Sequence, residues 1–430
     1  MRIVKRLGLL ICYLVAVLAL CDVVLILLNI LPPKHLYGDQ TVGFLNPQGT
    51  GVPYTFQSDH WRYSQSDSGL IAVNERGFRS DRTIRQIHSS PKKNSICVIG
   101  DSHTDLPYKN EYTHPFVLQR CLIESGFRDV EVFAAGRGSY SPLQACLYYE
   151  NFVQDLQPSV LILNLYTGND FFDMIRIDDR PYYEPDGAGK YRIHPPVWYK
   201  FTDPSTKGSL IDKSRVLFLG EMLARRWGIW RFFIHFRYLV DLSKLQGEGV
   251  AAAVSYMLDL NRTEESSLAF PPAFAAQILN QHLFFRYFPA TKSESFRRLE
   301  YLLGSMHQKH PGLTLIVSPI PSAALSGELQ ADSMFRSVLS RANLDYSSLV
   351  SEESNLYDSC RTMAERHGWH FINNLDPLRR EVGGHQLFLS EDLHLSPFGS
   401  SVIGRNEAIH VMRLLGPVNS WNRFSGASEP

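Results

Sequence analysis

The sequence has no excess of charge of either sign and little cysteine. Its 430 residues include 43 Lys and Arg and 43 Asp and Glu, so the formal net charge is zero. A chain without net charge has no overall field that attracts nucleic acid or anionic lipid, and no nucleic-acid partner is expected. Six cysteines in this length form no disulfide framework. One bridge between Cys121 and Cys146 stays open in an oxidising compartment.

The motifs of metal and nucleotide sites are also missing. The histidines show no metal-ligand spacing such as His-Glu-x-x-His. Neither glycine-rich turn of the chain is followed by the Lys-Ser/Thr pair of a phosphate-binding loop, although a doubly wound nucleotide binder would share the strand pattern described below. The sequence therefore predicts no metal and no cofactor.

One long apolar run is present at the N-terminus. Residues 7–31 are almost continuously apolar, and about 20 such residues span a bilayer. Arg2, Lys5 and Arg6 precede the run, which predicts that the N-terminus stays in the cytoplasm and the rest is exported. No small-residue cleavage site is evident. We expect residues 1–31 to be a single-pass signal anchor in the cytoplasmic membrane, with the remaining chain in the periplasm or extracytoplasmic space.

Beyond the anchor, short apolar runs alternate with amphipathic segments. Hydrophobic residues make up 44% of the chain and aromatic residues 12%, which is ample for a large core. Strands are expected at 95–99, 130–133, 160–165, 313–317 and 370–372, and helices at 113–122, 141–153, 291–306 and 397–415. The third helix is expected to begin with a capping box, Thr291-x-x-Glu294. This alternation predicts an α/β/α sandwich with a central parallel sheet, whose ligands bind at the carboxyl ends of the strands.

The expected domain organisation has four parts. After the anchor, residues 32–90 form a polar approach segment, residues 91–418 the main domain, and residues 419–430 a flexible tail. An insertion at about 175–290 interrupts the alternation and is rich in aromatic and basic residues. A substrate lid, a helix on the membrane surface and a hydrophobic mini-core all remain open for it.

Two polar runs almost 290 residues apart offer a catalytic triad. Gly100-Asp101-Ser102-His103-Thr104 follows the first expected strand, and Asp392-Leu393-His394 precedes a Ser-Pro helix start. A serine hydroxyl becomes a nucleophile when an imidazole takes its proton and a carboxylate orients that imidazole. Ser102, His394 and Asp392 are therefore the candidate catalytic residues. His103 is expected to shape the pocket and not to act as the base.

Two further runs offer donors for an oxyanion hole. Gly136-Arg137-Gly138-Ser139 follows the second expected strand, and Gly168-Asn169-Asp170 follows the third. A tetrahedral intermediate needs preorganised N–H donors at its negative oxygen. The candidates are the backbone N–H of Gly138 or Ser139, the side chain of Asn169 and the N–H of Ser102.

Taken in order, these four runs resemble the blocks of the SGNH/GDSL hydrolase superfamily, which contribute Ser, Gly, Asn and His. The resemblance covers about residues 90–175 and 290–415. It implies a flavodoxin-like fold, with Ser102 as nucleophile and Asn169 in the oxyanion hole. Asp392 and His394 are assigned to the block in which the family places an aspartate three residues before the histidine. Residues 73–79 resemble the Asn-x-x-Gly-Phe-Arg run that membrane-anchored members carry before the nucleophile strand.

The second block departs from the family pattern. Close relatives read Asn-x-Gly-x-x-Gly-Tyr, whereas this chain reads Ala134-Ala-Gly-Arg-Gly-Ser-Tyr140. Counting from Gly136 puts Ser139 at the place of the oxyanion glycine, with Gly138 one position earlier. A backbone N–H is available from either residue, so both remain candidates.

The resemblance implies a serine esterase that hydrolyses acyl esters, above all O-acetyl esters, outside the cytoplasm. The expected substrate is an acylated polysaccharide, another cell-surface glycan or a small ester. Anchored relatives often accompany polysaccharide assembly, so assembly proteins are further candidate partners. Two alternatives stay open. One is an O-acyltransferase that passes the acyl group to a glycan hydroxyl through the same triad, and the other is a non-catalytic glycan-binding or assembly scaffold with a degenerate SGNH fold.

Overall fold

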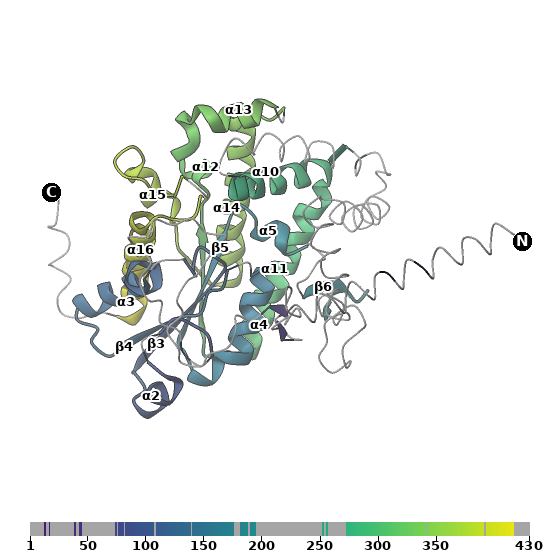
Figure 1. The fold of residues 1–430 in the computed structure, drawn as a ribbon. Coiled ribbons are helices and arrows are strands. Elements are labelled where there is room, and N and C mark those ends of the chain that lie inside the picture. The colour runs from purple at the N-terminus through teal and green to yellow at the C-terminus, as the bar shows by residue number, and fades with distance from the viewer. Residues whose placement is uncertain are drawn as a thin grey trace, which may run out of the picture. The chain divides into compact units, whose positions relative to one another are not determined.

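A five-stranded parallel sheet forms the centre of the structure (Figure 1). Its strand order is β4-β3-β5-β8-β9. The bounds are β3 Asn94–Ile99, β4 Val130–Ala134, β5 Val160–Tyr166, β8 Thr314–Ile320 and β9 His370–Phe371. Numbered along the chain within this sheet, the order is 2-1-3-4-5, the doubly wound flavodoxin-like arrangement. The predicted α/β fold with a central parallel sheet is confirmed, and its ligand crevice is expected where the order reverses, between β3 and β5.

The computed structural model describes most of the residues around the central sheet. The described residues are 13, 17, 38–39, 43–44, 74, 76–80, 82–106, 109–138, 140–175, 181–187, 190–194, 252, 255–256, 272–341, 343–390 and 393–416. The chain divides into two units. The larger comprises Leu45–Arg176, Tyr182–His194 and Leu258–Pro430 and contains the sheet. The smaller comprises Met1–Phe44, Ile177–Pro181 and Pro195–Met257, and a short antiparallel pair, β1 (Gly38–Asp39) and β2 (Gly43–Phe44), belongs to it.

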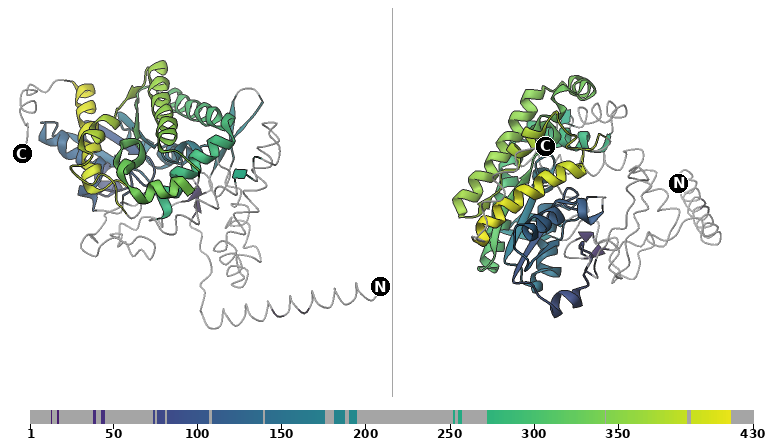
Figure 2. Two further views of the ribbon diagram at one scale, coloured as in Figure 1. Left: turned by 90° about the horizontal axis from the view of Figure 1, so that it is seen from above. Right: turned by 90° about the vertical axis from the view of Figure 1, so that its left-hand side faces the viewer.

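Helices cover both faces of the sheet. On one face α3 (His114–Glu124) packs against α16 (Pro397–Leu415), and their apolar side chains share a core with the inward residues of β3, β4 and β5. On the other face lie α4 (Pro142–Phe152), α11 (Pro289–Lys309) and α14 (Tyr346–His367). Figures 1 and 2 show these layers from three directions.

Shorter elements follow the carboxyl ends of the strands and complete the unit. They are α5 (Asp170–Asp173) after β5, α12 (Ala323–Ser326) and α13 (Ser333–Arg341) after β8, and α15 (Leu375–Glu381) after β9. Helix α10 (Pro272–Tyr287) precedes α11 and contacts α5. A hairpin of β6 (Tyr182–Pro185) and β7 (Tyr191–His194) lies between α5 and α10 in sequence, and α2 (Ile84–Ser89) precedes β3.

Two local expectations are corrected by the structure. Helix α11 begins at Pro289, not at the proposed capping box. The hydroxyl of Thr291 donates to the carbonyl of Phe288 (2.5 Å), and Glu294 pairs with Arg298 within the helix. Strand β8 runs three residues beyond Val317, through Pro319. A proline is tolerated there because β9 pairs only with Ile316 and Val317, so no neighbour on that side needs its missing N–H.

The open question of a cysteine bridge also has an answer. Cys121 on α3 and Cys146 on α4 are both free thiols, and their helices cover opposite faces of the sheet. No Cys121–Cys146 disulfide is formed. Burial raises the pKa of the Cys146 thiol, which keeps it protonated at neutral pH.

Several expectations concern residues that lie outside the described part of the chain. The apolar run at 7–31 is almost wholly among them, as are the tail at 419–430 and residues 225–238 of the expected insertion, a stretch rich in basic and aromatic residues. Within the residues that are described, none of the helices combines the length and the apolarity needed to cross a membrane.

Candidate active site

The nucleophile candidate lies on a tight turn at the carboxyl end of β3. The backbone N–H groups of Thr104 and Asp105 both donate to the carbonyl of Asp101, at 3.1 and 3.0 Å. The buried carboxylate of Asp101 accepts the N–H of His103 at 2.9 Å. These bonds fold the chain around Ser102, whose side chain remains partly exposed.

The glycine turn after β4 packs directly on this nucleophile turn. The N–H of Arg137 donates to the carbonyl of Gly100 at 3.0 Å. A Cβ atom at Gly136 would lie 2.4 Å from Cβ and Cγ2 of Thr104, so no larger residue fits there without displacing the turn. A Cβ atom at Gly138 would lie 4.0 Å from Cβ of Ser102. The structure therefore brings Gly138 beside Ser102, as an oxyanion donor requires.

The N–H of Gly138 already has an acceptor. It donates to Oδ2 of Asp105 at 3.3 Å, and Oδ1 of the same carboxylate accepts Nε of Arg79 at 2.8 Å. Burial alone would raise the pKa of Asp105, but the charges of Arg79 and Arg137 hold it below its usual value, so the group is ionised. At 3.3 Å this hydrogen bond is long, and in this arrangement it directs the Gly138 N–H at Asp105. Ser139, the other candidate of this turn, lies outside the described residues.

The base candidate, His394, is about 290 residues from Ser102 in sequence but lies near the nucleophile turn in the fold. It is 1% exposed, and its ring centroid lies 5.1 Å from that of His103, the residue after Ser102. Its loop is closed by hydrogen bonds from Leu389 N–H to the carbonyl of His394 (2.8 Å) and from Leu393 N–H to the carbonyl of Leu389 (2.9 Å). Among the residues that the structure describes, no hydrogen bond joins Ser102 to His394. Such bonds are commonly long before substrate binds.

His103 lies close to both the base candidate and Tyr166 of β5. It is fully buried, and its ring stacks on that of Tyr166 at a centroid distance of 3.8 Å. Burial lowers the pKa of His103 well below its usual value, and the nearby His394 and His114 lower it further. His103 is therefore neutral at physiological pH. Its ring lies against Tyr166 and near His394, beside the nucleophile turn.

Asn169 follows the carboxyl end of β5. Ser102 follows the neighbouring strand β3, and the strand order reverses between these two strands. Nδ2 of Asn169 donates one hydrogen to Oδ2 of Asp173 at 2.9 Å, which fixes the orientation of the amide. A side-chain amide carries two N–H groups, so the second remains for another acceptor. A Cβ atom at the preceding residue, Gly168, would lie 2.5 Å from Cε1 of Tyr166. The ring that supports His103 therefore also requires a glycine before Asn169.

The acid candidate cannot be placed, because residues 391 and 392 lie outside the described part of the chain. Its spacing, however, needs a correction. Asp392 stands two residues before His394, whereas the family block has its aspartate three residues before, and that position here is Glu391. The intervening Leu393 adopts a φ of +59°, a left-handed conformation that is unfavourable for leucine and common at functional sites. Two adjacent carboxylates thus precede the base.

A buried polar network lies near the nucleophile turn, and sequence patterns did not reveal it. Nδ1 of His114 on α3 contacts Glu407 of α16 at 2.9 Å. The other oxygen of Glu407 accepts Asn164 of β5 (2.8 Å) and Ser318 of β8 (3.0 Å). The hydroxyl of Thr104 reaches the same network at Asn164, 3.4 Å away. Because these residues come from five separate segments, no local signal could have found them.

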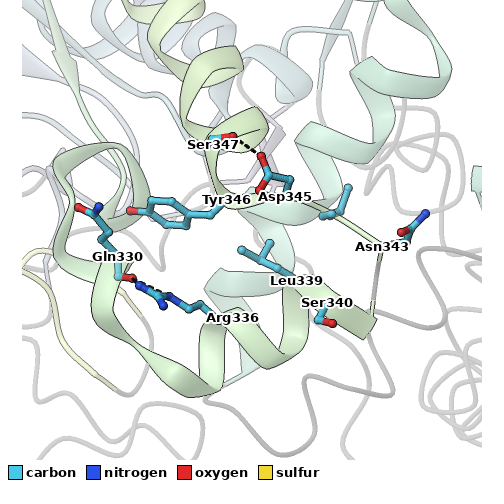
Figure 3. Close-up of a pocket in the computed structure, with 9 residues that line it drawn as sticks. Gln330, Arg336, Leu339, Ser340, Asn343, Asp345, Tyr346 and Ser347 are labelled. Atoms are coloured by element: carbon cyan, nitrogen blue, oxygen red, sulfur yellow. Dashed lines mark hydrogen bonds between the residues drawn. The ribbon is translucent and has the colours of Figure 1, made fainter.

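A hollow of about 590 Å³ lies elsewhere, between α13 and the start of α14. Figure 3 shows Arg336 donating to the backbone of Gln330 at one wall, with Tyr346 and Asp345 at the other. None of the residues proposed for catalysis lines it.

No protein-family model matches the chain, and no curated protein matches its sequence. Its structure is similar to those of several hydrolases at low identity. An α/β hydrolase from the metagenome of Lake Arreo, Spain, is 12% identical, with a TM-score of 0.32 over 74% of this chain and 94% of that one. An acetylxylan esterase from Geobacillus stearothermophilus is 10% identical, with a TM-score of 0.32 over 75% and 95%. The acetyl xylan esterase AlAXEase is 11% identical, with a TM-score of 0.32 over 74% and 100%.

Proposed function

We propose that this chain is a serine esterase of the SGNH/GDSL type. The observation that carries the proposal is the position of His394. Its imidazole lies 5.1 Å from the ring of His103 and is thereby brought to the turn of Ser102, although almost 290 residues separate the two in sequence. Both stand at the carboxyl edge of a doubly wound sheet, where such folds bind their ligands.

In the proposed reaction, Oγ of Ser102 attacks the acyl carbon while His394 takes its proton. The tetrahedral oxyanion accepts hydrogen bonds from the second N–H of Asn169, from the N–H of Ser102 and from the N–H of Ser139, because the N–H of Gly138 is directed at Asp105. Collapse breaks the ester bond, and His394 returns the proton to the departing alcohol. Water, activated by His394, then releases the acyl group from Ser102 as a carboxylic acid. Asp392 orients the imidazole.

The proposed substrate is a short acyl ester, such as an O-acetyl group, on a polysaccharide or another surface glycan. The stacked rings of His103 and Tyr166 are fully buried beside the nucleophile turn, and we take them as one wall of an acyl pocket, which favours a small acyl group. The extracytoplasmic location and the membrane anchor rest on the apolar run at 7–31 and the basic residues before it.

The test uses the full-length chain with short-chain aryl esters and acetylated glycans, followed by a fluorophosphonate probe. Wild type should hydrolyse acetyl esters and become labelled, and Ser102→Ala should lose both properties with its fold intact. His394→Ala should lower the rate about as much, ~10⁴-fold, and the double variant little further, because the residues act as a unit. Equal labelling of wild type and Ser102→Ala would contradict the assignment.

One observation favours the scaffold alternative. The N–H of Gly138 donates to Asp105, and Ser139 replaces the family glycine, so the oxyanion hole departs from its usual form. A chain that binds acetylated glycans but neither hydrolyses them nor reacts with the probe would support the scaffold. Transfer of the acyl group to an added glycan hydroxyl, faster than to water, would support the acyltransferase.

A further inference from the structure

One side chain of α10 holds the segment that carries Asn169 from both ends. Nε2 of Gln281 donates to the carbonyl of Thr167 at 2.6 Å, and Oε1 of Gln281 accepts the N–H of Phe172 at 3.1 Å. Thr167 and Phe172 flank Asn169 on the two sides. Because one partner offers only an acceptor and the other only a donor, the orientation of the Gln281 amide is set by its contacts.

The same helix packs on this segment through its apolar face. Ile278 lies one turn before Gln281, and a Cβ atom at Gly168 would lie 3.0 Å from its Cγ1. Ile278 is 2% exposed and Gln281 is 4% exposed, so the contact excludes water. A hydrogen bond that is shielded from water is costly to break, because its partners are left unsatisfied.

A second buried group, the carboxylate of Glu353, also holds Thr167. The hydroxyl of Thr167 contacts Oε1 of Glu353 on α14, and Glu353 also accepts the N–H and the hydroxyl of Ser322, at 3.0 and 2.6 Å. The N–H of Thr167 donates to the carbonyl of Ile320 at the end of β8, at 2.9 Å. Because these bonds hold Thr167 in place, the two bonds of Gln281 set where the backbone runs between Thr167 and Phe172.

We propose that Gln281 is a positioning residue for the oxyanion asparagine, and that α10 thereby belongs to the catalytic apparatus and not to a separate insertion. The inference rests on the proposed function. Gln281 does not touch the reacting atoms. It holds the backbone whose displacement by about 1 Å would move the Asn169 amide away from the oxyanion, and displacements of that size cost about 10²-fold in rate.

The test compares Gln281→Met, which keeps the shape of the side chain but loses both hydrogen bonds, with Arg286→Gln on the exposed side of the same helix. Gln281→Met should lower kcat about 10- to 100-fold with KM within about twofold, because the donor matters when the oxygen carries charge. Arg286→Gln should change neither. Combined with Asn169→Ala, the Gln281→Met change should cost little more, because it acts through that amide.

A second measurement does not depend on turnover. Hydrogen exchange should show faster exchange at residues 167–173 in Gln281→Met, with the central strands unchanged. If Gln281→Met fails to fold, Gln281→Glu keeps the acceptor for Phe172 but turns an acceptor oxygen toward the carbonyl of Thr167, and it should show the same pattern. An active wild type whose kcat is unaffected by both variants would overturn the inference. So would a full additional loss in the Asn169→Ala background. A wild type that is inactive and unlabelled at Ser102 would overturn the proposed function, and the inference with it.

Discussion

Arg79 and Asp105 form a buried ion pair that ties the segment before β3 to the nucleophile turn. The Nε–Oδ1 distance is 2.8 Å, and the two side chains are 4% and 16% exposed. Arg79 ends the Asn-x-x-Gly-Phe-Arg run, and its backbone also bridges to Ala134 at the end of β4. Since Asp105 accepts the N–H of Gly138 as well, this run has a physical role. Through the carboxylate of Asp105, the run holds the glycine turn against the turn of Ser102.

Loss of the Arg79 side chain should therefore destabilise the fold. Arg79→Met leaves the carboxylate of Asp105 with the N–H of Gly138 and with Arg137, a more distant cation 4.0 Å away. We expect the free energy of unfolding to fall by about 3–5 kcal/mol, as when one partner of a buried pair is removed. The matched control is Arg297→Met, whose guanidinium is 67% exposed and whose partner Glu294 also pairs with Arg298, so its loss should cost ~1 kcal/mol or less. Urea unfolding of both variants measures these changes. An equal loss of free energy of unfolding in the two variants would show that the ion pair of Arg79 stabilises the fold no more than an exposed pair does.

Glu353 should give the stability of the protein a pH dependence of known sign. Burial raises its pKa above the ordinary 4.5, and the hydrogen bonds from Ser322 and Thr167 only partly oppose this. The folded state therefore holds the proton more tightly than the unfolded chain. The resulting stabilisation is fully present below pH 4.5 and is lost as the pH rises from there through the folded pKa.

The Glu353→Gln variant tests this sign, because glutamine cannot ionise. Between pH 4.5 and 7.5 the free energy of unfolding of the wild type should fall relative to that of the variant. For Glu365→Gln, at an exposed position of the same helix, the free energy of unfolding should change with pH as it does in the wild type. A wild type that gains stability relative to Glu353→Gln as the pH rises would reverse the sign and contradict the prediction.

The parts of the fold that follow from local patterns were predictable from sequence. Helix α16 occupies the expected 397–415, because Ser396 accepts the N–H of Gly399 (3.0 Å) and Pro397 stands at the first helical position. The Thr291 capping box failed although its pattern was present, because Pro289 allows an earlier start and the Thr291 hydroxyl bonds to Phe288 instead. A local motif predicts that a helix begins, and competing contacts decide where.

The supports of the candidate site could not be predicted in this way. Gln281 is 114 residues from Thr167, and Glu353 is 186 residues from it. Asp105 stands three residues after Ser102, yet its role depends on Arg79 and Gly138, which come from other segments. Sequence patterns predict which strand ends hold the candidate site residues, because the proposed reaction needs particular residue types at those positions. The side chains that hold those ends in place can be any polar group of suitable length, and only the folded chain brings them together.

Asn169 provides a direct test of the proposed oxyanion hole. Asn169→Ala should lower kcat by ~10²–10³ with little change in KM, since the donor acts mainly on the charged intermediate. Asn169→Asp should be at least as damaging, because its carboxylate would face both the oxyanion and Asp173, which now accepts the Asn169 amide at 2.9 Å. Steady-state kinetics on an aryl acetate measures both. Near-normal turnover of Asn169→Ala would remove this residue from the hole.

Two neighbouring carboxylates compete for the role of the acid, and substitution separates them. If Asp392 orients His394, Asp392→Asn should lower kcat by ~10⁴, because the imidazole would take the wrong tautomer. Glu391→Gln should then cost less than about tenfold. The opposite ranking would show that the family spacing of three residues holds and that Glu391 is the acid. Thermal unfolding of both variants checks that the fold is retained.

The last prediction concerns topology, on which the proposed glycan substrate depends. With Arg2, Lys5 and Arg6 inside, the apolar run at 7–31 should stay in the membrane and place Ser102 on the outer face. A reporter that is active only after export, fused after Pro430, should be active, and it should become inactive when residues 7–31 are deleted. The chain should also remain with the membrane through high-salt and carbonate washes, as a spanning helix does and a peripheral helix does not. A cytoplasmic reporter signal would remove surface glycans from the substrates and leave an esterase of intracellular acyl esters.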